Sequence, residues 1–370
     1  MKRVLILEPY YGGSHKLFLT GLQKTVTADY TLLTLPARKW KMRMQLSAFW
    51  FIQEIMKFPE QGRNFDTVLC STFVDVAILR SQLILIPGWN RNTHICTYFH
   101  ENQFVYPGQT VDPTIRQFTA INFTTAMASD SCAFNSRYNL ESFLNAVSSS
   151  LKKATDMRLS FCVDEIRNKS VVLYPGMDYS SVDQAEPDVK NTNDGPPVIL
   201  WNHRWEHDKG PELFFNALYF IQKNKIDFRL IVMGESFMKK PECFEEALGR
   251  LEKEIIHFGY AESREEYSKL LHQCDVIVST AKHEFFGISV LEGIRAGCYP
   301  LLPADLSYPE LYDVEYLYKP GKLGKRLLDF MKNPIQLKKE TTQALTSLFE
   351  WNVCKTNYKE FLFVNAREIL

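Results

Sequence analysis

The sequence predicts an α/β protein with two doubly wound domains, and three features indicate this fold class. Short apolar runs alternate with longer segments of helical periodicity along the 370 residues. The runs are almost continuously apolar, as parallel strands are when helices cover both faces of their sheet. The alternation is interrupted once by a polar segment and then restarts. The length suffices for two hydrophobic cores of ordinary size.

The first series of apolar runs defines a first domain at residues 1–182. Helical spacing follows the first run, where Leu19, Leu22 and Val26 share one face. The predicted strands of this domain cover residues 3–8, 30–35, 67–71, 94–99, 131–135 and 170–175.

The polar segment at residues 183–197 is the predicted linker, because it is rich in Pro, Asp and Asn. A second domain follows at residues 198–350, with helical spacing at Phe214, Leu218 and Ile221. Residues 351–370 are predicted to form a helix that packs back across both domains. Doubly wound sheets bind ligands outside the carboxyl ends of their strands, so we expect the two domains to face a central cleft. The predicted strands of the second domain cover residues 197–201, 228–234, 255–260, 275–280 and 299–303.

Composition and charge narrow the class of protein. Hydrophobic residues make up 45% and charged residues 23%, which excludes a disordered chain. The formal net charge is zero, but residues 1–182 hold 19 Lys and Arg against 14 Asp and Glu, and the remainder is acidic. This asymmetry points to an anionic partner of the first half, and chance scatter of surface charge is the alternative.

The cysteine pattern and the lengths of the apolar runs indicate in which cellular compartment the protein is expected. The eight cysteines occur singly, without a C-x-x-C pair, which fits free thiols in a reducing compartment. The N-terminal apolar run is shorter than a secretory signal requires, and no run of about 18 apolar residues occurs. We therefore expect a cytoplasmic protein without a membrane partner.

The first candidate site follows the first predicted strand, in "EPYYGGSHKLFL" (8–19). Gly12 and Gly13 allow positive φ and close approach of a ligand, and Ser14 is a candidate N-cap of the next helix. The N–H groups at that helix end favour negative charge, and His15 and Lys16 follow them. The pattern is not G-x-G-x-x-G, so it does not indicate a dinucleotide fold. A simple strand–helix turn is the alternative.

The second candidate site is "WNHRWEHDKGPELFF" (201–215). Arg204 and Lys209 follow the first strand of the second domain, and Gly210-Pro211 begins a helix. Two cations beside a helix N-terminus suit a diphosphate. A solvated charged loop explains the same residues.

The third and sharpest candidate is "HEFFGISVLEGIRAG" (283–297). Glu284 lies before a helix that begins near Phe286-Gly287, and Glu292 lies about one and a half turns into it. One carboxylate can accept hydrogen bonds from sugar hydroxyls and the other from a ribose diol, while the N–H groups near Gly287, Ile288 and Ser289 can hold phosphate. The alternative is a helix with a charged face.

Two further candidates follow strands of the first domain. His100, Glu101 and Asn102 come directly after the strand at 94–99, where a doubly wound domain places its site. Asn135 and Ser136 follow the strand at 131–135, and Ser136 has an alternative role as a helix N-cap.

A basic stretch with an aromatic residue lies at positions 38–43. Its side chains suit a phosphate backbone and base stacking, and a solvated amphipathic helix face is the alternative. The residues are Arg38, Lys39, Trp40, Lys41 and Arg43.

These motifs together resemble the retaining glycosyltransferases of the GT-B architecture, which has two Rossmann-like domains. The E-x7-E pair of that superfamily is matched by Glu284 and Glu292, and its Arg and Lys by Arg204 and Lys209. The stretches "EPYYGGSHK", "TLPARKWKMR", "YFHENQFVYP" and "FNSRYNLESF" are similar to the N-terminal domain of the tRNA-queuosine alpha-mannosyltransferase family.

The resemblance implies a retaining mannosyl transfer from GDP-mannose to the cyclopentenediol of queuosine in a tRNA anticodon, that of tRNA-Asp. It implies catalytic roles for His100, Arg204, Lys209 and Glu284. It implies donor contacts from Gly12, Gly13, Gly234, Glu235, Phe286, Gly287, Ile288, Ser289 and Glu292. The loops at Gly234-Glu235 and Gly259-Tyr260 are candidates for reading the base. Acceptor contacts would come from residues 14–16 and 38–43 and from Glu101, Asn102, Asn135 and Ser136. No Asp-x-Asp triplet or His/Cys ligand pattern occurs, so neither metal nor another cofactor is expected.

Three alternatives stay open at this stage. One is a glycosyltransferase of the same architecture that uses another nucleotide sugar on a lipid or polysaccharide, for which residues 38–51 would be a basic surface helix. Another is a phosphorolytic enzyme, and the third is a non-catalytic tRNA-binding protein on a transferase fold. The complete set of Glu284, Glu292, Arg204 and Lys209 argues against the third.

Overall fold

The computed structural model describes residues 1–105, 115–186, 195–236 and 240–363. The chain divides into two compact units. Unit 1 comprises Met1–Met177 together with the segment that begins at Trp351, and unit 2 comprises Asp178–Glu350. The division lies five residues before the expected boundary at 182.

Unit 1 is built on a six-stranded sheet in the order β2-β1-β3-β4-β5-β6, and every pair of neighbours is parallel. Because β1 has β2 on one side and β3 on the other, the strand order reverses beside β1. Such a reversal is where open α/β sheets bind ligands. The strands are β1 (Arg3–Tyr11), β2 (Asp29–Pro36), β3 (Thr67–Ser71), β4 (His94–Phe99), β5 (Ser131–Phe134) and β6 (Ser170–Val172).

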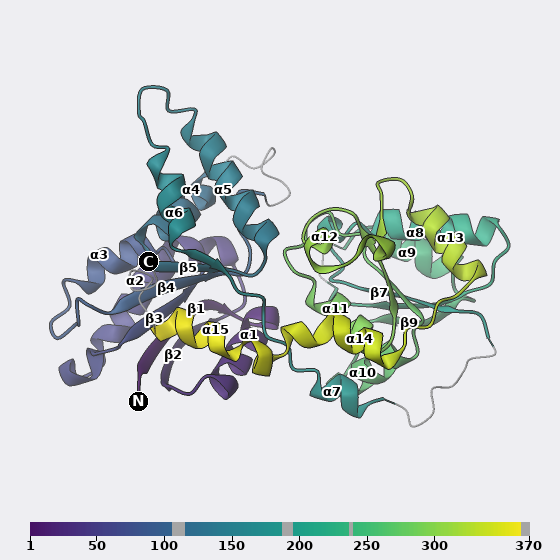
Figure 1. Cartoon of the computed structure of the whole chain (residues 1–370), viewed down its shortest axis with the longest axis horizontal. Coiled ribbons are helices and arrows are strands. Elements are labelled where there is room, and N and C mark those ends of the chain that lie inside the picture. The colour runs from purple at the N-terminus through teal and green to yellow at the C-terminus, as the bar shows by residue number, and fades with distance from the viewer. Residues whose placement is uncertain (106–114, 187–194, 237–239, 364–370) are drawn as a thin grey trace. The chain divides into compact units, whose positions relative to one another are not determined.

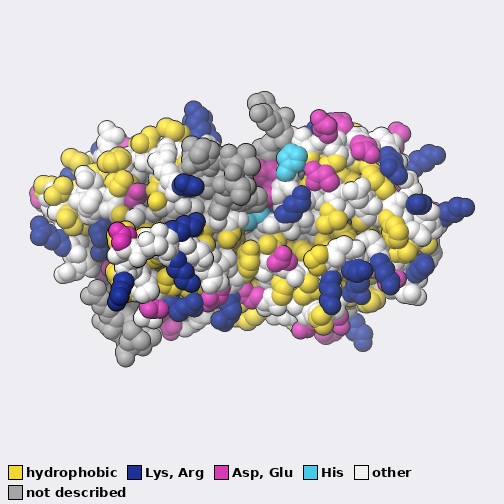
Figure 2. Space-filling view, turned by 90° about the horizontal axis from the view of Figure 1, so that it is seen from above, with side chains coloured by type: hydrophobic (Ala, Val, Ile, Leu, Met, Phe, Trp, Pro, Cys, Tyr) yellow, Lys and Arg dark blue, Asp and Glu magenta, His cyan; other side chains and the backbone are white. Residues whose placement is uncertain are grey.

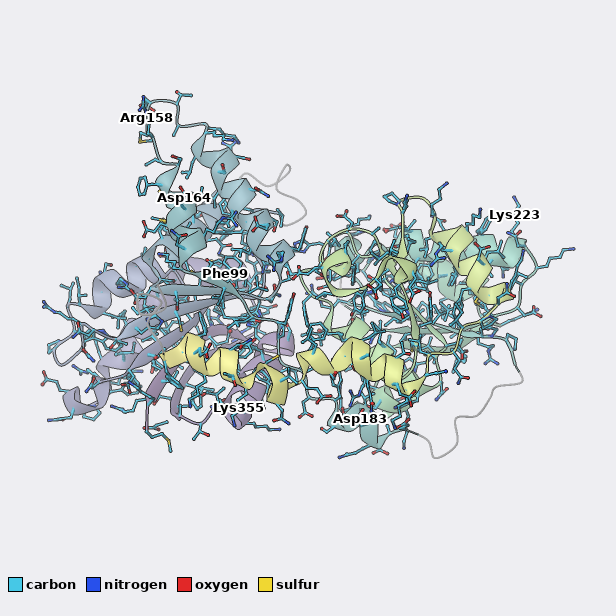
Figure 3. All side chains as sticks on the ribbon, viewed as in Figure 1. Phe99, Arg158, Asp164, Asp183, Lys223 and Lys355 are labelled. Carbon is cyan, nitrogen blue, oxygen red and sulfur yellow. The ribbon has the colours of Figure 1, made fainter. Side chains whose placement is uncertain are left out.

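Helices cover both faces of this sheet, as the apolar runs predict. Along β1, Val4 and Ile6 pack against Phe18 and Leu22 of α1, whereas Leu5 and Leu7 belong to the core under α2 and α3. Phe99, labelled in Figure 3 at the end of β4, is fully buried in a third cluster with α5 and α6. The helices are α1 (Gly13–Thr25), α2 (Trp40–Met56), α3 (Val76–Leu83), α4 (Ile115–Ala128), α5 (Arg137–Leu151) and α6 (Phe161–Asn168).

The helix α15 (Trp351–Phe363) completes unit 1 from the far end of the sequence (Figure 1). Trp351 and Tyr358 are buried in the same cluster as Phe18, and the Tyr358 hydroxyl donates to the carbonyl of Tyr174 at 2.8 Å. A Cβ on Gly21 or on Gly176 would overlap the Trp351 ring, so both glycines are needed for this packing. The predicted C-terminal helix is therefore present over Trp351–Phe363 and belongs to the core of unit 1, whereas residues 364–370 of the prediction lie outside the described part of the chain.

Unit 2 repeats the architecture with a sheet in the order β12-β11-β10-β7-β8-β9. Its first strand, β7 (Val198–Asn202), lies between β8 (Arg229–Met233) and β10 (Val276–Val278), so the order reverses beside β7. The other strands are β9 (Ile255–Gly259), β11 (Tyr299–Pro303) and β12 (Leu317–Tyr318). The helices are α7 (Ser180–Gln184), α8 (Pro211–Lys223), α9 (Cys243–Arg250), α10 (Arg264–His272), α11 (Ile288–Arg295), α12 (Tyr308–Leu311), α13 (Leu323–Lys332) and α14 (Lys339–Thr346).

The predicted linker at 183–197 is structured where it begins. Residues 180–184 form α7, which packs on α10 and α11 within unit 2, and residues 187–194 lie outside the described part of the chain. Arg295 of α11 pairs with Asp183 through two contacts of 2.7 Å and with Glu350 at 3.1 Å. The Arg295 guanidinium thus forms ion pairs with residues near both ends of unit 2.

Two other expectations differ from the structure. The first strand runs to Tyr11 instead of ending near Glu8, with a register shift between Glu8 and Tyr11 that accommodates an extra residue. The two-residue β12 was not predicted, because it has no apolar run of its own. Among the described residues, no helix is long and apolar enough to cross a membrane.

Candidate active site

The candidate site of unit 2 lies where the strand order reverses, at the carboxyl ends of β7 and β10. Hydrogen bonds join the loops that follow these strands. Thr280 donates from Oγ1 to the Lys209 carbonyl at 2.9 Å, and the same Oγ1 accepts from Nε1 of Trp201 at 3.0 Å. Gly210 has φ +62°, and a Cβ there would lie 2.3 Å from the Thr280 carbonyl oxygen. The two loops are therefore held in close contact.

This contact brings together Lys209 and Glu284, two of the predicted catalytic residues. Lys209 Nζ donates to the His283 carbonyl at 2.7 Å and to Glu284 Oε2 at 3.3 Å, and it lies 3.4 Å from Asp208 Oδ2. Burial opposes ionisation of Glu284, but the Lys209 ammonium outweighs it and lowers the pKa of Glu284 to about 2. Glu284 is therefore an acceptor of hydrogen bonds at neutral pH.

The helix α11 begins beside this pair, as the sequence predicts. Its N-cap is Gly287, with φ +94°, and Ile288 and Ser289 form its first turn. A Cβ on Gly287 would lie 3.3 Å from Cε1 of Tyr308 and 3.8 Å from Cγ of Glu284. The first N–H groups of a helix have no partner within it, so this end can receive an anion next to Glu284. Phe286 is buried and packs on Phe349.

The second glutamate of the motif, Glu292, is held by α10. Its Oε2 accepts from the Tyr267 hydroxyl at 2.6 Å, and its Oε1 accepts from Arg264. Asn202 in turn donates to the Tyr267 hydroxyl at 2.7 Å. The carboxylate is 6% exposed and still has free lone pairs, so it can accept further hydrogen bonds. Arg264 and Tyr267 were not predicted, because α10 carries no motif of its own.

Other residues predicted to act on the nucleotide-sugar donor lie at the same edge of the sheet but are more exposed than Lys209 and Glu284 or serve packing. The Arg204 side chain is 47% exposed and pairs with Glu206 at 3.1 Å. Gly234 has φ +151°, and a Cβ there would lie 1.8 Å from the His203 carbonyl oxygen, which explains the glycine. Glu235 is exposed, and its carbonyl accepts from the Trp205 N–H at 2.9 Å. Gly234 therefore serves close packing of the two loops.

The sequence analysis missed His203, which follows β7 directly. Its side chain is 5% exposed, and its Nε2 has no hydrogen-bond partner within the described residues. Burial and the Lys209 cation lower the pKa of His203 to about 4, so the ring is neutral at pH 7. A histidine directly after an apolar strand is the signal that selected His100, and the same signal could have found His203.

Unit 1 also gathers polar side chains where its strand order reverses, beside β1 and β3. Glu8 is 1% exposed, and its Oε1 accepts from the Tyr10 N–H at 2.8 Å and from Ser71 Oγ at 3.1 Å. Its Oε2 lies 2.9 Å from His15 Nδ1. The strand extension past Glu8 therefore positions a buried carboxylate that sequence reasoning treated only as a strand end.

His15 lies between two carboxylates and beneath His100. Its Nε2 faces Glu101 Oε2 at 3.6 Å, and its ring stacks on His100 with centroids 4.0 Å apart. Burial opposes the charge, but Glu8 and Glu101 outweigh it and raise the pKa of His15 to about 10. Burial and the neighbouring His15 hold the pKa of His100 well below its usual range. The arrangement is a buried imidazolium under a neutral, partly exposed imidazole.

Glu8, His15 and His100 form a group whose potential ligand atoms all lie within 4.8 Å of one another. The sequence did not suggest this cluster, because His100 is far from Glu8 and His15 in the chain. Both nitrogens of His15 already face carboxylates, and the two ring planes are stacked at 30°. In-plane lone pairs of stacked rings do not converge on one point, so the geometry is that of an ion cluster.

The glycine loop of unit 1 differs in detail from the prediction. Gly12 is the N-cap of α1, and no side chain caps the helix, so the predicted N-cap role of Ser14 is wrong: Ser14 already lies inside the first turn. A Cβ on Gly12 would lie 2.6 Å from Cβ of Ala37, whereas Gly13, with φ +49°, has open space around it. Lys16 is exposed, with Nζ 5.8 Å from the Tyr11 ring centroid.

Three predicted acceptor residues serve the fold of unit 1. Asn102 is fully buried, and its Nδ2 donates to Asn139 Oδ1 at 2.8 Å. Asn135 Nδ2 donates to the His100 carbonyl at 2.6 Å, which holds His100 in place. Ser136 is fully buried and caps α5 by accepting from the Asn139 N–H at 3.0 Å. The N-cap alternative for Ser136 is confirmed. Asn102 and Ser136 are fully buried, and their assignment as acceptor contacts stays a prediction.

The basic stretch lies at the start of α2. Arg38, Lys39 and Lys41 are exposed, Lys39 as the N-cap with φ +54°, and Arg43 is partly buried. Trp40 packs on Phe118 with centroids 5.0 Å apart, so half of its ring belongs to the core. Phe49, 51% exposed on the same helix, is the aromatic side chain that prediction missed. Figure 2 shows basic side chains interspersed with acidic and hydrophobic ones on the face in view.

Comparison with known proteins shows which protein families the two units resemble. Residues 3–177 match the family model of the tRNA-queuosine alpha-mannosyltransferase N-terminal domain, and residues 182–344 match glycosyl transferases group 1. The tRNA-queuosine alpha-mannosyltransferase of Drosophila melanogaster is 34% identical over 350 residues, which is 92% of this chain and 90% of that protein. The chain belongs to the tRNA-queuosine alpha-mannosyltransferase family. The resemblance noted from the sequence is thereby confirmed, and the protein is a hexosyltransferase.

A bacterial relative and two solved structures extend the comparison. The GDP-mannose:cellobiosyl-diphosphopolyprenol alpha-mannosyltransferase of Xanthomonas oryzae pv. oryzae is 26% identical over 106 residues, 28% of each chain. Sucrose-phosphate synthase from Thermosynechococcus elongatus has a TM-score of 0.72, with 11% identity over 100% of this chain and 99% of that one. Anabaena HepE in complex with UDP has a TM-score of 0.61, with 14% identity over 100% and 97%. The fold is GT-B.

Proposed function

We propose that this protein transfers mannose from GDP-mannose to the cyclopentenediol of queuosine in the anticodon of a tRNA, with tRNA-Asp as the expected substrate. The meeting of Lys209 and Glu284 beside the free end of α11 carries this proposal, because it joins a cation, a fixed carboxylate and an anion-binding helix end. The names of two relatives, a queuosine mannosyltransferase and a GDP-mannose enzyme, support the acceptor and the donor.

In this proposal the donor diphosphate is the leaving group. Lys209 and the N–H groups at the start of α11 stabilise its developing charge, Glu284 accepts hydrogen bonds from mannose hydroxyls, and Glu292 accepts them from the ribose. Retention of the anomeric configuration is proposed from the family resemblance. The reaction is proposed to need no metal ion, because these groups supply the charge that the leaving group requires. His100, neutral and partly exposed, is the contact with the sugar or the acceptor hydroxyl.

The tRNA is proposed to lie on unit 1. Arg38, Lys39 and Lys41 would contact phosphates, and the exposed Phe49 adds an apolar surface on which a base can stack. The eight unpaired cysteines support action in a reducing compartment such as the cytoplasm.

The test uses labelled GDP-mannose with two tRNA pools, one that contains queuosine and one that lacks it. We expect label only in the queuosine pool, and loss of that label in Glu284→Gln. Label in both pools would overturn the acceptor. Label in neither pool, with GDP still bound, would overturn the transfer reaction and leave a nucleotide-binding protein of this fold.

A further inference from the structure

His203 lies at the carboxyl end of β7, where the strand order of unit 2 reverses. Its N–H donates to the Met233 carbonyl at 3.2 Å, and its ring packs edge-on against Trp201 with centroids 5.1 Å apart. Gly234 lies against its carbonyl so closely that no Cβ fits there. The backbone of His203 is thus fixed by the end of β8 and the glycine that follows it, and the charges of Lys209 and Glu284 act on its ring.

The ring of His203 has a buried polar atom without a partner. Its Nε2 makes no hydrogen bond within the described residues, although the side chain is only 5% exposed. Leaving such an atom unsatisfied has a free-energy cost, so native proteins rarely retain one without a function. Because Nε2 of His257 also has no partner among the described residues, this feature alone does not identify a site. The Nε2 of His203 differs because it follows a strand at the reversal, beside Lys209 and Glu284, where a ligand can bring a hydrogen-bonding atom to it.

The charges that face His203 indicate which ligand this is. They belong to Lys209, Glu284, Asp208 and Arg204. The two cations follow the same strand as His203, at positions suited to phosphate oxygens, whereas Glu284 is already held by Lys209. A neutral imidazole among them offers one N–H donor and adds no charge before the anion arrives.

We propose that His203 is a donor-binding residue whose Nε2 hydrogen-bonds an oxygen of the diphosphate of the nucleotide sugar. The inference deepens the proposed function and rests on it only for the presence of a nucleoside diphosphate in this site. His203 thus adds a neutral hydrogen-bond donor to Lys209 and Arg204, the cations that are expected to bind the diphosphate. Because the bound anion stabilises an imidazolium, binding also raises the affinity of His203 for a proton.

The experiment measures binding of GDP and of UDP to the full-length protein by calorimetry at pH 7.5. We compare the wild type with His203→Gln and with His257→Gln. His257 lies in β9, and its Nε2 also has no partner among the described residues, so it is a matched control away from the strand ends. A hydrogen bond to a charged group predicts affinity about 10- to 100-fold weaker in His203→Gln and unchanged in His257→Gln.

A second readout is the pH dependence of GDP-mannose binding between pH 7 and 4.5. The diphosphate of this donor is a diester without a proton that titrates in the range. Proton uptake at His203 predicts that the wild type binds more tightly as the pH falls, and that His203→Gln loses this dependence. A merely structural histidine would not produce it.

Three results would overturn the inference. They are affinity of His203→Gln within twofold of the wild type, no binding of either nucleotide by the wild type, and, if His203→Gln does not fold, wild-type affinity for GDP-mannose that is constant over this pH range. Failure of the proposed function is distinguishable, because a protein that binds GDP through His203 yet transfers no mannose would leave this inference standing.

Discussion

Two histidines at the reversal points of the two sheets are equally buried but differ in protonation at pH 7: His15 is cationic and His203 is neutral. His15 in unit 1 and His203 in unit 2 are both 5% exposed. The pKa of His15 is raised to about 10, and that of His203 is lowered to about 4. His15 has a carboxylate on each ring nitrogen, whereas His203 has an unpartnered Nε2 and a lysine nearby.

The comparison shows that partners, and not burial, decide the protonation state of a buried histidine. The comparison also distinguishes the roles of the two sites. In unit 1 the His15 cation is paired with Glu8 and Glu101, although Glu101 Oε1 has no hydrogen-bond partner among the described residues, and the partly exposed His100 is the group that remains available. In unit 2 a buried nitrogen is left for a ligand. We expect damage to the first site to affect mainly folding and damage to the second to affect mainly donor binding.

The largest expected effect is on the stability of unit 1 in His15→Gln. The substitution leaves Glu8 as a buried carboxylate without its cation, which costs about 3–5 kcal/mol of unfolding free energy near pH 6.5. The raised pKa gives the sign of the pH dependence: the contribution of His15 is complete below pH 6.5 and is lost as the pH rises through about 10. Urea denaturation from pH 6.5 to 9.5 measures the difference.

Glu8→Gln in the same background is the control, because it removes the unpaired charge and should restore part of the lost stability. A His15→Gln protein as stable as the wild type at pH 6.5 would contradict the ion cluster.

Lys209→Ala should give the next largest effect, on catalysis. Removal of the ammonium takes a cation from the leaving group and the partner from Glu284, and kcat for transfer from GDP-mannose should fall about 10²–10³-fold. Lys282→Ala is the matched control, since Lys282 is exposed on the same loop as Glu284. Equal loss in both variants would show that the loop, and not the Lys209 charge, is responsible.

His203→Gln should change the pH dependence of stability in the direction opposite to His15→Gln. The lowered pKa means that the unfolded wild type binds a proton that the folded protein does not, so the wild type loses about 2 kcal/mol between pH 8 and pH 5 through this residue. The variant should lack this loss. Thermal melts of both proteins without ligand at pH 8 and pH 5 measure this loss. An equal change of stability with pH in the wild type and in His203→Gln would refute a neutral His203.

Ser136→Ala should have the smallest effect and tests whether unit 1 uses its polar residues for itself. Loss of the α5 N-cap costs about 1 kcal/mol, while the KM for queuosine-containing tRNA should stay unchanged. A raised KM at unchanged stability would support the acceptor role of Ser136.

The fold could be predicted because apolar runs report on strands that are buried on both faces. The central strands and helices such as α8, with Phe214, Leu218 and Ile221 buried, occur where periodicity placed them. Lys209 and Glu284 could be predicted because each follows a strand beside the reversal. Glu8 was treated only as a strand end because its contacts with His15 and Ser71 are not visible in the sequence, and His203 was overlooked although it follows a strand beside the reversal. The N-cap role predicted for Ser14 was wrong because the N-cap of α1 lies two residues earlier, at Gly12, and the acceptor role of Trp40 stays a prediction because an aromatic side chain that packs on Phe118 can also belong to the core.

Because of helix α15, the order in which the two units can complete folding is the reverse of the order in which they are translated. Residues 1–177 leave the ribosome first, but Trp351 and Tyr358 fill the core around Phe18 only after everything between has been translated. Unit 2 is continuous in sequence and can fold as soon as it emerges. The unit that is made first is therefore finished last, and until then His100 lies over a sheet that lacks part of its cover.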